Sequence, residues 1–472
     1  MDTDSTHKAD SRRELRPFFE PRGVAIVGAT RTLGFGYILP LALKRQGWGD
    51  RVFLINPAGG EVHGMTRYLG MGEVPGDVDL AVVIVPAAAV AGTLDELGSY
   101  GIRHAIIESA GFAETDESGK AMQEEVSEVA SRHHMRIIGP NCVGVINTAN
   151  RFSTVEVVDE ALRPGPLAVI AQSGVFGNIL LDGLHQRGLF ISKAVTLGNR
   201  MDVDECEVLD YFHGDPDTEV IIMYLEGAAD GRKLLSTIRR VSRDKPVLVL
   251  KSGRTASGRQ ATSSHTGSLS GEDLLYEAAF RQSGAVRAES LEEIVEMARV
   301  FATQPLPDGM RLGILTSSGS LGALTTDAAV EAGLEVPPLS TRTVEMVRAG
   351  APQWMNVRNP LDVGPSGHFL TALDAILQDP GIDMVIAISV MPFAVLREFV
   401  EQGISVGDWL GDAAAVRQCA PHKPMLVCSI GDEGFIKELS RATGPETPVL
   451  TSPEMAARAL AALCRYRLVK EG

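Results

Sequence analysis

The sequence predicts an α/β protein made of three doubly wound domains, and three observations support this. The chain has 472 residues, well beyond the roughly 250 to 300 residues at which a single core stops growing. Short β-branched runs alternate with helical patterns along most of the chain, which is typical of parallel sheets covered by helices. The 49 Gly and 25 Pro residues supply the many tight turns of such a fold.

Composition argues against several classes of protein. With 60 acidic and 44 basic residues the net charge is -16, which disfavours nucleic acid and anionic membranes as partners. Residues 1–22 are polar and lack the apolar run of a secretory signal, and no stretch reaches the ~18 apolar residues of a membrane span. The five Cys show no C-x-x-C spacing, so we expect reduced thiols, no metal site and a cytoplasmic protein.

The first predicted domain covers residues 23–147, after a polar N-terminal tail at 1–22. Its expected strands are 24–27, 52–55, 80–85, 104–107 and 135–138. Helical patterns separate these runs, as parallel strand order requires.

Two further domains are expected at residues 148–303 and 311–472, joined by a Pro/Gly linker at 304–310. In the second domain, strands are expected at 167–170, 193–196, 220–224 and 246–250, with a closing helix at 291–303. In the third, strands are expected at 312–315, 384–388, 424–427 and 448–450.

The turn after the first strand is a candidate nucleotide site. The segment 27–36 is rich in glycine, so a phosphate could approach its backbone, although a tight turn without a ligand is the alternative. The second strand ends in Asn56-Pro57 and not in the acidic residue that binds a ribose hydroxyl. This favours a nucleotide-containing ligand other than NAD.

Further candidates lie at other strand ends of the first domain, where small residues, proline and asparagine line the crevice of such a sheet. Each of these segments alone is also compatible with a simple turn. The candidate residues of the whole crevice are Gly28, Ala29, Thr30, Arg31, Asn56, Pro57, Val85, Pro86, Ser109, Ala110, Asn141 and Cys142.

The second and third domains open alike, with a strand, a Ser/Gly loop and a helix. The two loops are 171–177 and 316–322. Free N–H groups and the helix dipole make such helix N-termini potential anion sites.

The segment 251–271 is predicted to be a long loop before a helix that starts near Glu272. It carries His265 among hydroxyl residues, with Arg254 and Arg259 upstream. A neutral imidazole can attack an activated phosphoryl group, and hydroxyls, amides and Arg can hold the transferred phosphate. A polar surface histidine is the alternative.

Two acidic segments follow strands of the second domain. Glu226 comes just after the strand at 220–224, where a carboxylate could accept the Nδ1–H of a histidine and fix its tautomer. An ordinary loop glutamate is the alternative. The run 202–205 is interpreted as charges at a helix N-terminus in preference to a metal site.

Taken together, these segments resemble the NDP-forming acyl-CoA synthetases, which include ADP-forming acetate-CoA ligases and succinyl-CoA synthetase. The resemblance covers about residues 20 to 465 and is specific through the order of its motifs: Val27-Gly-Ala, Asn56-Pro57, Ser109-Ala-Gly-Phe-Ala-Glu114, Gly139-Pro-Asn-Cys-Val-Gly-Val-Ile-Asn147, Gln172-Ser-Gly174, Leu197-Gly-Asn199, Tyr224-Leu-Glu-Gly227 and Ser264-His-Thr-Gly267. The third domain makes the chain similar to the α subunits of ADP-forming acetate-CoA ligases, since a succinyl-CoA synthetase α subunit would end after the second.

The resemblance implies a Rossmann-like CoA-binding domain and two flavodoxin-like domains, the first of which carries the phosphohistidine. By matching motifs, His265 is the phosphorylated residue and Glu226 orients it. The implied phosphate-binding residues are Gln172, Ser173, Gly174, Ser264, Thr266, Gly267, Ser317, Ser318 and Gly319. The loop at 317–320 reads Ser-Ser-Gly-Ser, which departs from the usual Asn-Ser-Gly-Gly type.

No ATP-grasp domain and no Walker motif is recognisable. The resemblance therefore implies that ADP or ATP with Mg²⁺ binds a separate ATP-grasp β subunit, in an α2β2 hetero-oligomer. The expected reaction converts acyl-CoA, phosphate and ADP to a carboxylic acid, CoA and ATP. A non-catalytic CoA-binding regulatory protein and an NAD-dependent oxidoreductase are the other hypotheses. The intact histidine motif argues against the first, and the missing acidic residue argues against the second.

Overall fold

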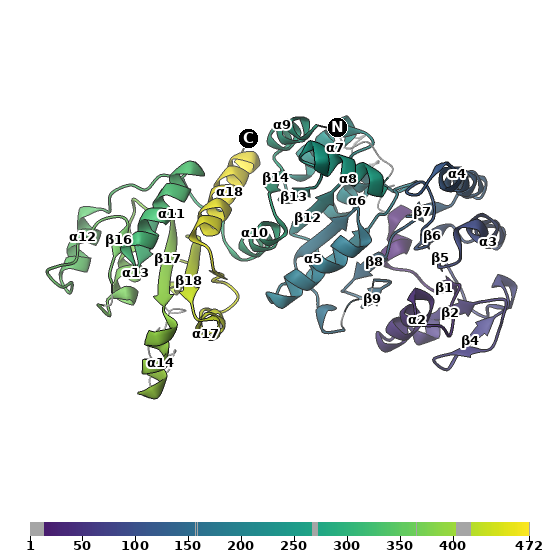
Figure 1. The fold of residues 1–472 in the computed structure, drawn as a ribbon, viewed down its shortest axis with the longest axis horizontal. Coiled ribbons are helices and arrows are strands. Elements are labelled where there is room, and N and C mark those ends of the chain that lie inside the picture. The colour runs from purple at the N-terminus through teal and green to yellow at the C-terminus, as the bar shows by residue number, and fades with distance from the viewer. Residues whose placement is uncertain are drawn as a thin grey trace. The chain divides into compact units, whose positions relative to one another are not determined.

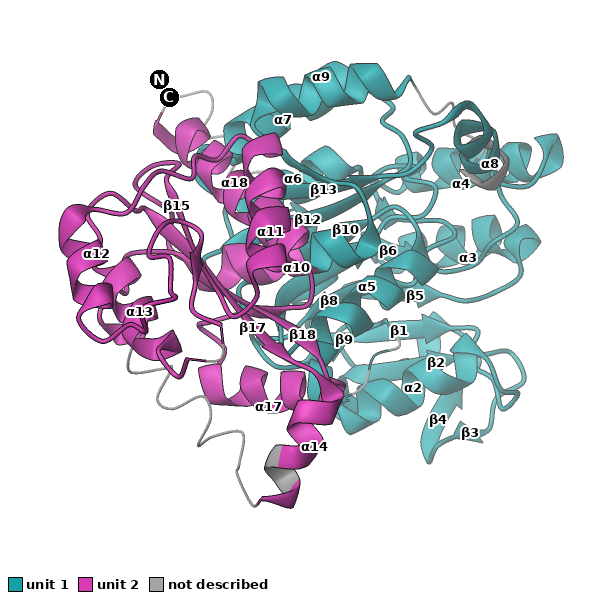
Figure 2. Ribbon diagram, turned by 60° about the vertical axis from the view of Figure 1, so that its left-hand side comes forward, with its two compact units in different colours: residues 1–295 teal, residues 296–472 magenta. Residues whose placement is uncertain are grey.

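The computed structural model describes residues 14–155, 157, 159–266, 272–364, 366–402 and 417–471. Three sheets form within them (Figure 1), and the chain divides into two compact units, residues 1–295 and 296–472 (Figure 2). The division falls within α10 (Leu291–Thr303), before the segment predicted as a linker. The first predicted domain, and the second as far as residue 295, thus belong to one unit. The α/β fold class is confirmed.

The first sheet contains seven strands, and all its pairs are parallel except β3 with β4. Its strands lie in the order β3 (Glu61–Val62), β4 (Met65–Tyr68), β2 (Val52–Ile55), β1 (Val24–Val27), β5 (Leu80–Val83), β6 (His104–Ile107) and β7 (Arg136–Ile138). The helices are α2 (Phe35–Arg45), α3 (Ala87–Ser99) and α4 (Glu117–Arg132), with short 3₁₀ turns η1 (Gly49–Arg51) and η2 (Met71–Glu73). Every residue of β1 and β5 is buried, which is why these strands read as continuous apolar runs.

The second sheet also belongs to the first unit. Its strands lie in the order β14 (Val286–Ala288), β13 (Val247–Lys251), β12 (Val220–Leu225), β10 (Leu167–Ala171), β11 (Ile191–Thr196), β8 (Gly144–Asn147) and β9 (Phe152–Ser153). Around it are η3 (Asp159–Ala161), α5 (Gly174–Gln186), α6 (Glu205–His213), α7 (Gly231–Val241), α8 (Ala256–Thr266) and α9 (Asp273–Ser283). The segment 144–147, assigned from sequence to the end of the first domain, pairs antiparallel with β11. Its apolar pattern could not show which sheet it joins.

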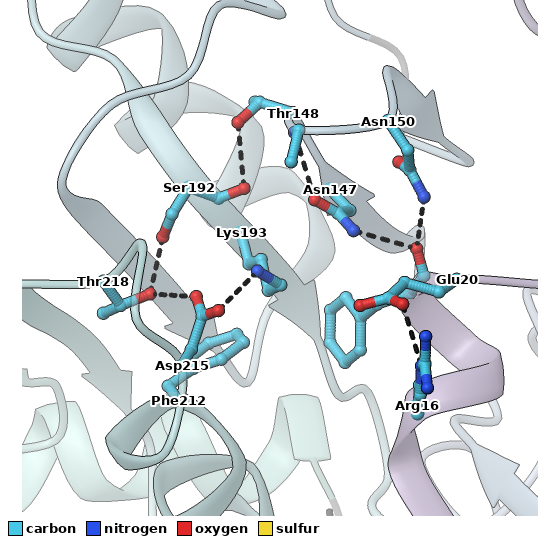
Figure 3. Close-up of polar contacts among 12 residues, drawn as sticks. Arg16, Glu20, Asn147, Thr148, Asn150, Ser192, Lys193, Phe212, Asp215 and Thr218 are labelled. Carbon is cyan, nitrogen blue, oxygen red and sulfur yellow. Dashed lines mark hydrogen bonds and ion pairs between the residues drawn. The ribbon is translucent and has the colours of Figure 1, made fainter.

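Polar contacts surround the end of β8 and the start of β11 (Figure 3). Lys193 forms a 2.9 Å ion pair with Asp215, and the two side chains are only 4% and 7% exposed. The amides of Asn147 and Asn150 both donate to the carbonyl oxygen of Phe19, at 3.1 and 3.0 Å. Removing either partner of such a buried pair would leave an uncompensated buried charge, which is strongly destabilising.

The third sheet forms the second unit and is fully parallel, in the order β16 (Leu361–Asp362), β15 (Leu312–Thr316), β17 (Met384–Met391), β18 (Met425–Gly431) and β19 (Val449–Leu450). Its helices are α11 (Gly319–Glu331), α12 (Thr341–Arg348), α13 (Phe369–Leu377), α14 (Phe393–Glu401), α17 (Glu433–Thr443) and α18 (Pro453–Glu471). Its apolar core includes Leu315, Leu373 and Phe435.

Each sheet has a point where successive strands are added on opposite sides. It lies between β1 and β5 in the first sheet, between β10 and β12 in the second, and between β15 and β17 in the third. Ligands of doubly wound folds bind at the carboxyl ends of the strands at such points. The candidate residues can now be placed against these three positions.

The sequence predicts no membrane span and reduced cysteine thiols. No helix within the described ranges has both the length and the apolar composition needed to cross a membrane. All five cysteines lie in those ranges and have free thiols.

Candidate active site

The switch point of the second sheet gathers several candidate residues. Gln172 and Ser173 follow β10, and Glu226 follows β12, its neighbour in the sheet. Helix α5 begins at Gly174, and Ser173 caps it by accepting from the backbone N–H of Phe176 at 3.5 Å. The prediction of a helix N-terminus at this strand end is confirmed, with free N–H groups and the positive end of the helix dipole at the crevice.

The side chain of Gln172 is bonded to the loop that carries Glu226. Its Oε1 accepts from the N–H of Glu226 at 2.6 Å and of Gly227 at 3.1 Å, while its Nε2 donates to the carbonyl of Gly227 at 2.8 Å. Only 4% of Gln172 is exposed. A buried amide with three such bonds fixes the backbone on either side of the Glu226 peptide.

The carboxylate of Glu226 is held from the side of its own strand. The residue is 5% exposed, and the hydroxyl of Tyr224 donates to its Oε1 at 3.3 Å. The ring of Phe176 stacks on Tyr224 with centroids 3.8 Å apart. Burial raises the pKa of Tyr224 to about 12, so its hydroxyl remains a donor at neutral pH.

Lys251, the last residue of β13, places a buried ammonium next to this region. It pairs with Leu225 across the sheet and is 2% exposed. Its Nζ donates to the carbonyl of Ser252 and lies 4.6 Å from the ring centroid of Tyr276. Burial lowers the pKa of Lys251 to about 8, although Asp273 and Glu226 act to raise it. The sequence did not reveal that Lys251 is a buried charged residue near Glu226, because a lysine at a strand end is usually exposed.

The segment that carries His265 differs from the expected long loop. Residues 256–266 form helix α8, which is capped by a 3.0 Å hydrogen bond from the N–H of Gly258 to Thr255 Oγ1. The small polar residues resemble a loop, but their backbone satisfies its hydrogen bonds as a helix. His265, Ser264 and Thr266 lie in the last turn, with side chains outside the described part, and Gly267 lies outside it altogether. Helix α9 begins at Asp273, as predicted.

The second predicted anion loop lies in the other unit, at the switch point of the third sheet. Helix α11 begins at Gly319 with Ser318 as its N-cap residue. The Ser317 hydroxyl accepts from the N–H of Val390 at 3.0 Å, and the hydroxyls of Ser318 and Ser320 lie 3.1 Å apart. The structure therefore confirms a helix N-terminus after this strand too.

The first sheet brings its candidates to one edge, at the carboxyl ends of β1, β2, β5, β6 and β7. Gly28 has a φ of 103°, and a Cβ there would lie 2.4 Å from the carbonyl oxygen of Ile84, so only glycine fits this turn. Asn56 donates to the carbonyl of Ala29 at 2.8 Å, which ties the first turn to the second strand. Thr30 and Val85 are partly buried, whereas Arg31, Pro57, Pro86 and Ala110 are exposed.

The remaining candidates of this edge differ in accessibility. The hydroxyl of Ser109 donates to the carbonyl of Val85 at 2.5 Å. Asn141 has a φ of 61° and is partly exposed, while Cys142 is buried and burial raises the pKa of its thiol. Arg67, on β4, is 9% exposed and reaches toward the carbonyl of Ala29. It was missed because the short polar strand β4 was not predicted.

The acidic run 202–205 is a helix N-terminus, as interpreted. Asp204 caps α6 by accepting from the N–H groups of Cys206 and Glu207 at 3.0 and 2.9 Å. Asp202 accepts from Arg136, and Glu205 from Arg200. These carboxylates are therefore occupied by capping and ion pairing.

Comparison with known families matches two parts of the chain. Residues 22–148 match a CoA binding domain, and residues 164–301 match the flavodoxin-like domain of succinyl-CoA ligases. The first match includes the predicted crevice of the first sheet, and the second includes Glu226 and His265.

Known proteins resemble the chain over nearly its whole length. It is 38% identical to acetate–CoA ligase [ADP-forming] II subunit alpha of Pyrococcus furiosus, covering 94% of this chain and 96% of the relative. For the I subunit alpha of the same organism the identity is 33%, over 96% and 97%. Among solved structures, a dinucleotide-forming acetyl-coenzyme A synthetase 1 of Ca. Korarchaeum cryptofilum, in complex with phosphate and ADP, aligns with a TM-score of 0.83, at 29% identity and over 97% of both chains.

Proposed function

This chain belongs to the family of ADP-forming acetate–CoA ligase α subunits, and we propose that it works through a phosphorylated His265. As a member of this family it is an acid–thiol ligase that uses CoA and a nucleotide. The proposed net reaction converts acyl-CoA, phosphate and ADP to a carboxylic acid, CoA and ATP. The finer assignments below concern the residues and the partner.

One observation carries the proposal. Helix α5, the loop with Glu226 and the segment leading to His265 leave adjacent strands β10, β12 and β13 at the same edge of one sheet. This juxtaposition brings together a helix N-terminus, a buried carboxylate and the strand end from which the segment with His265 departs. A helix N-terminus, a carboxylate and a histidine are the groups needed to hold phosphate, orient an imidazole and accept a phosphoryl group.

The chemistry proceeds in three balanced steps. A phosphate oxygen attacks the thioester carbonyl, the C–S bond breaks, and CoA leaves as its thiolate. His265 then attacks phosphorus of the acyl phosphate, an N–P bond forms, the O–P bond breaks, and the carboxylate leaves. Finally, an oxygen of the terminal phosphate of ADP attacks phosphorus, an O–P bond forms, the N–P bond breaks, and the neutral imidazole of His265 leaves as ATP is formed. Each group transfer thus conserves the energy of the thioester.

Each residue has a defined task in these steps. The N–H groups of Ser173 and Gly174 at the start of α5 hold phosphate oxygens, while Glu226 accepts Nδ1–H so that Nε2 of His265 is the nucleophile. Gln172 keeps the Glu226 peptide in place through three hydrogen bonds. Ser264, Thr266 and Gly267 are proposed to bind the phosphoryl group carried by His265. Ser317, Ser318 and Gly319, at the N-terminus of α11 in the other unit, are proposed as further phosphate-binding residues.

CoA is proposed to bind the crevice of the first sheet, within the part that matches a CoA binding domain. The Gly28 turn permits close backbone approach, and Arg31 and Arg67 supply positive charge. The amide of Asn56 is bonded to Ala29 and offers no carboxylate to a ribose, which argues against NAD.

The nucleotide is assigned to a separate ATP-grasp β subunit that binds ADP or ATP with Mg²⁺, in a cytoplasmic α2β2 assembly. The relatives are named alpha subunits, which implies a second subunit. The test is ATP formation from acetyl-CoA, phosphate and ADP. The purified chain alone should form none, and an added ATP-grasp subunit should restore it. Steady ATP formation by the single chain, with no second polypeptide found by mass spectrometry, would refute this division.

A further inference from the structure

The loop between β11 and α6, residues 197–203, runs from the second sheet to the end of β7 in the first. The N–H groups of Asn199 and Met201 donate to the carbonyls of Pro140 and Gly139 at 2.9 and 3.0 Å. A Cβ on Gly198 would lie 2.2 Å from the carbonyl oxygen of Pro140. Backbone contacts this close fix the loop at the boundary of the two sheets.

One side chain of this loop, that of Asn199, is hydrogen bonded to residues beside the first-sheet crevice. Asn199 Nδ2 donates to Glu114 at 2.6 Å and to Gln123 at 2.9 Å. Glu114 in turn accepts from the N–H groups of Gly111 and Phe112 at 2.6 and 3.1 Å. Burial alone would raise the pKa of Glu114, but the hydrogen bonds from Asn199 and these N–H groups outweigh it and lower the pKa.

The next side chain holds the Glu226 loop. Arg200 Nη1 donates to the carbonyl of Gly227 at 3.0 Å and to Glu205 Oε2 at 3.2 Å. The side chains of Arg200 and Glu205 are 11% and 4% exposed. Arg200 also has a φ of 55°, a conformation that a long side chain keeps only when its surroundings require it.

The carbonyl of Gly227 therefore receives two buried donors, one from Arg200 and one from Gln172. Gln172 approaches from the end of β10 and Arg200 from the end of β11, so the peptide after Glu226 is clamped between them. We infer that Arg200 is a positioning residue for Glu226, and that Asn199 beside it links this clamp to loop 109–114 of the first-sheet crevice. The inference rests on the proposed function for Glu226.

Three variants and one control test the clamp in the full-length chain. Arg200→Met removes both hydrogen bonds but leaves Glu205 as a buried charge, which can destabilise the fold. Arg200→Met with Glu205→Leu removes the charge pair together and avoids that penalty. Arg200→Lys keeps the charge without the planar fork. Arg232→Ala, an exposed site on α7, is the matched control.

The first measurement is amide hydrogen exchange, which needs no activity. Exchange at the Glu226 and Gly227 N–H groups should be at least about tenfold faster in both Met variants than in wild type and in Arg232→Ala, because opening the clamp exposes them. Unchanged exchange in the double variant would overturn the inference, whether or not the wild type is active.

The second measurement is phosphorylation of the chain by acetyl-CoA and radiolabelled phosphate. The maximal labelling rate of the double variant should fall about tenfold or more, with partial rescue in Arg200→Lys. The half-saturating acetyl-CoA concentration should stay within about twofold. A purely structural role for Arg200 would lower thermal stability and leave this rate per folded molecule unchanged, which contradicts the inference. Failure of the wild type to label would refute the proposed function, while hydrogen exchange still decides the clamp.

Discussion

The side-chain oxygen of Gln172 accepts the backbone N–H of Glu226 at 2.6 Å, across the boundary between β10 and β12. This contact joins the helix N-terminus after β10 to the carboxylate after β12. The family resemblance implies that Gln172 lies at the phosphate site, and its side-chain amide is bonded to the Glu226 loop.

Gln172→Leu should therefore lower the free energy of unfolding and the phosphorylation rate together. It leaves two buried N–H groups and one carbonyl without this partner, and an unsatisfied buried group costs about 1–3 kcal/mol. Gln186→Leu, at the exposed end of α5, should change the free energy by less than about 0.5 kcal/mol. Urea unfolding of both variants measures this, and equal stabilities would contradict the role given to Gln172.

Glu226→Gln should lower the phosphorylation rate by about 10² or more, because an amide of the same size orients the imidazole poorly. Rapid-quench labelling with acetyl-CoA and phosphate gives the rate. Calorimetric titration with CoA provides the control, since the first-sheet crevice is unchanged and CoA affinity should be retained. A wild-type labelling rate would reduce Glu226 to a structural residue.

Lys251→Met should stabilise the protein most below pH 8. The folded-state pKa of Lys251 is lowered to about 8 from 10.5, so between these values the unfolded chain binds more protons than the folded one. Wild-type stability therefore rises with pH in this window, relative to the Met variant. Denaturant unfolding from pH 7 to pH 10.5 should show the difference shrinking with pH. If the difference in unfolding free energy did not change with pH, the pKa of Lys251 would not be lowered in the folded protein.

Arg31→Ala should weaken CoA binding about tenfold. The substitution removes the exposed guanidinium at the Gly28 turn that is proposed to contact a phosphate of CoA. Isothermal titration calorimetry at two salt concentrations measures the affinity, and the loss should be larger at low salt. Arg132→Ala, on the surface of α4, is the control and should bind normally. Strong NAD binding by the wild type would instead revive the oxidoreductase hypothesis.

Local patterns in the sequence were sufficient to predict many elements. The strands at 24–27, 52–55 and 104–107 and the helix at 291–303 occur with the predicted bounds, because burial on both faces makes such strands apolar throughout and amphipathic periodicity marks the helix. Glu226 and Ser173 were placed at strand ends for the same reason.

Contacts between segments that are distant in the chain could not be predicted from local sequence patterns. Nothing local shows that β8 pairs with β11, that Arg200 reaches Gly227, or that Lys251 is buried, because each depends on segments distant in the chain. The helix α8 was missed for a different reason: Ser, Thr and Gly suggest a loop, yet capping by Thr255 lets them form a helix.

Phosphorylation of His265 tests the account most directly. The full-length wild-type chain, incubated with acetyl-CoA and radiolabelled phosphate, should gain an acid-labile, base-stable label on the peptide that contains His265, as expected for a phosphoramidate. His265→Asn should gain none and, with the ATP-grasp subunit, should form no ATP. Equal labelling of the Asn variant, or ATP formation by it at the wild-type rate, would contradict the account.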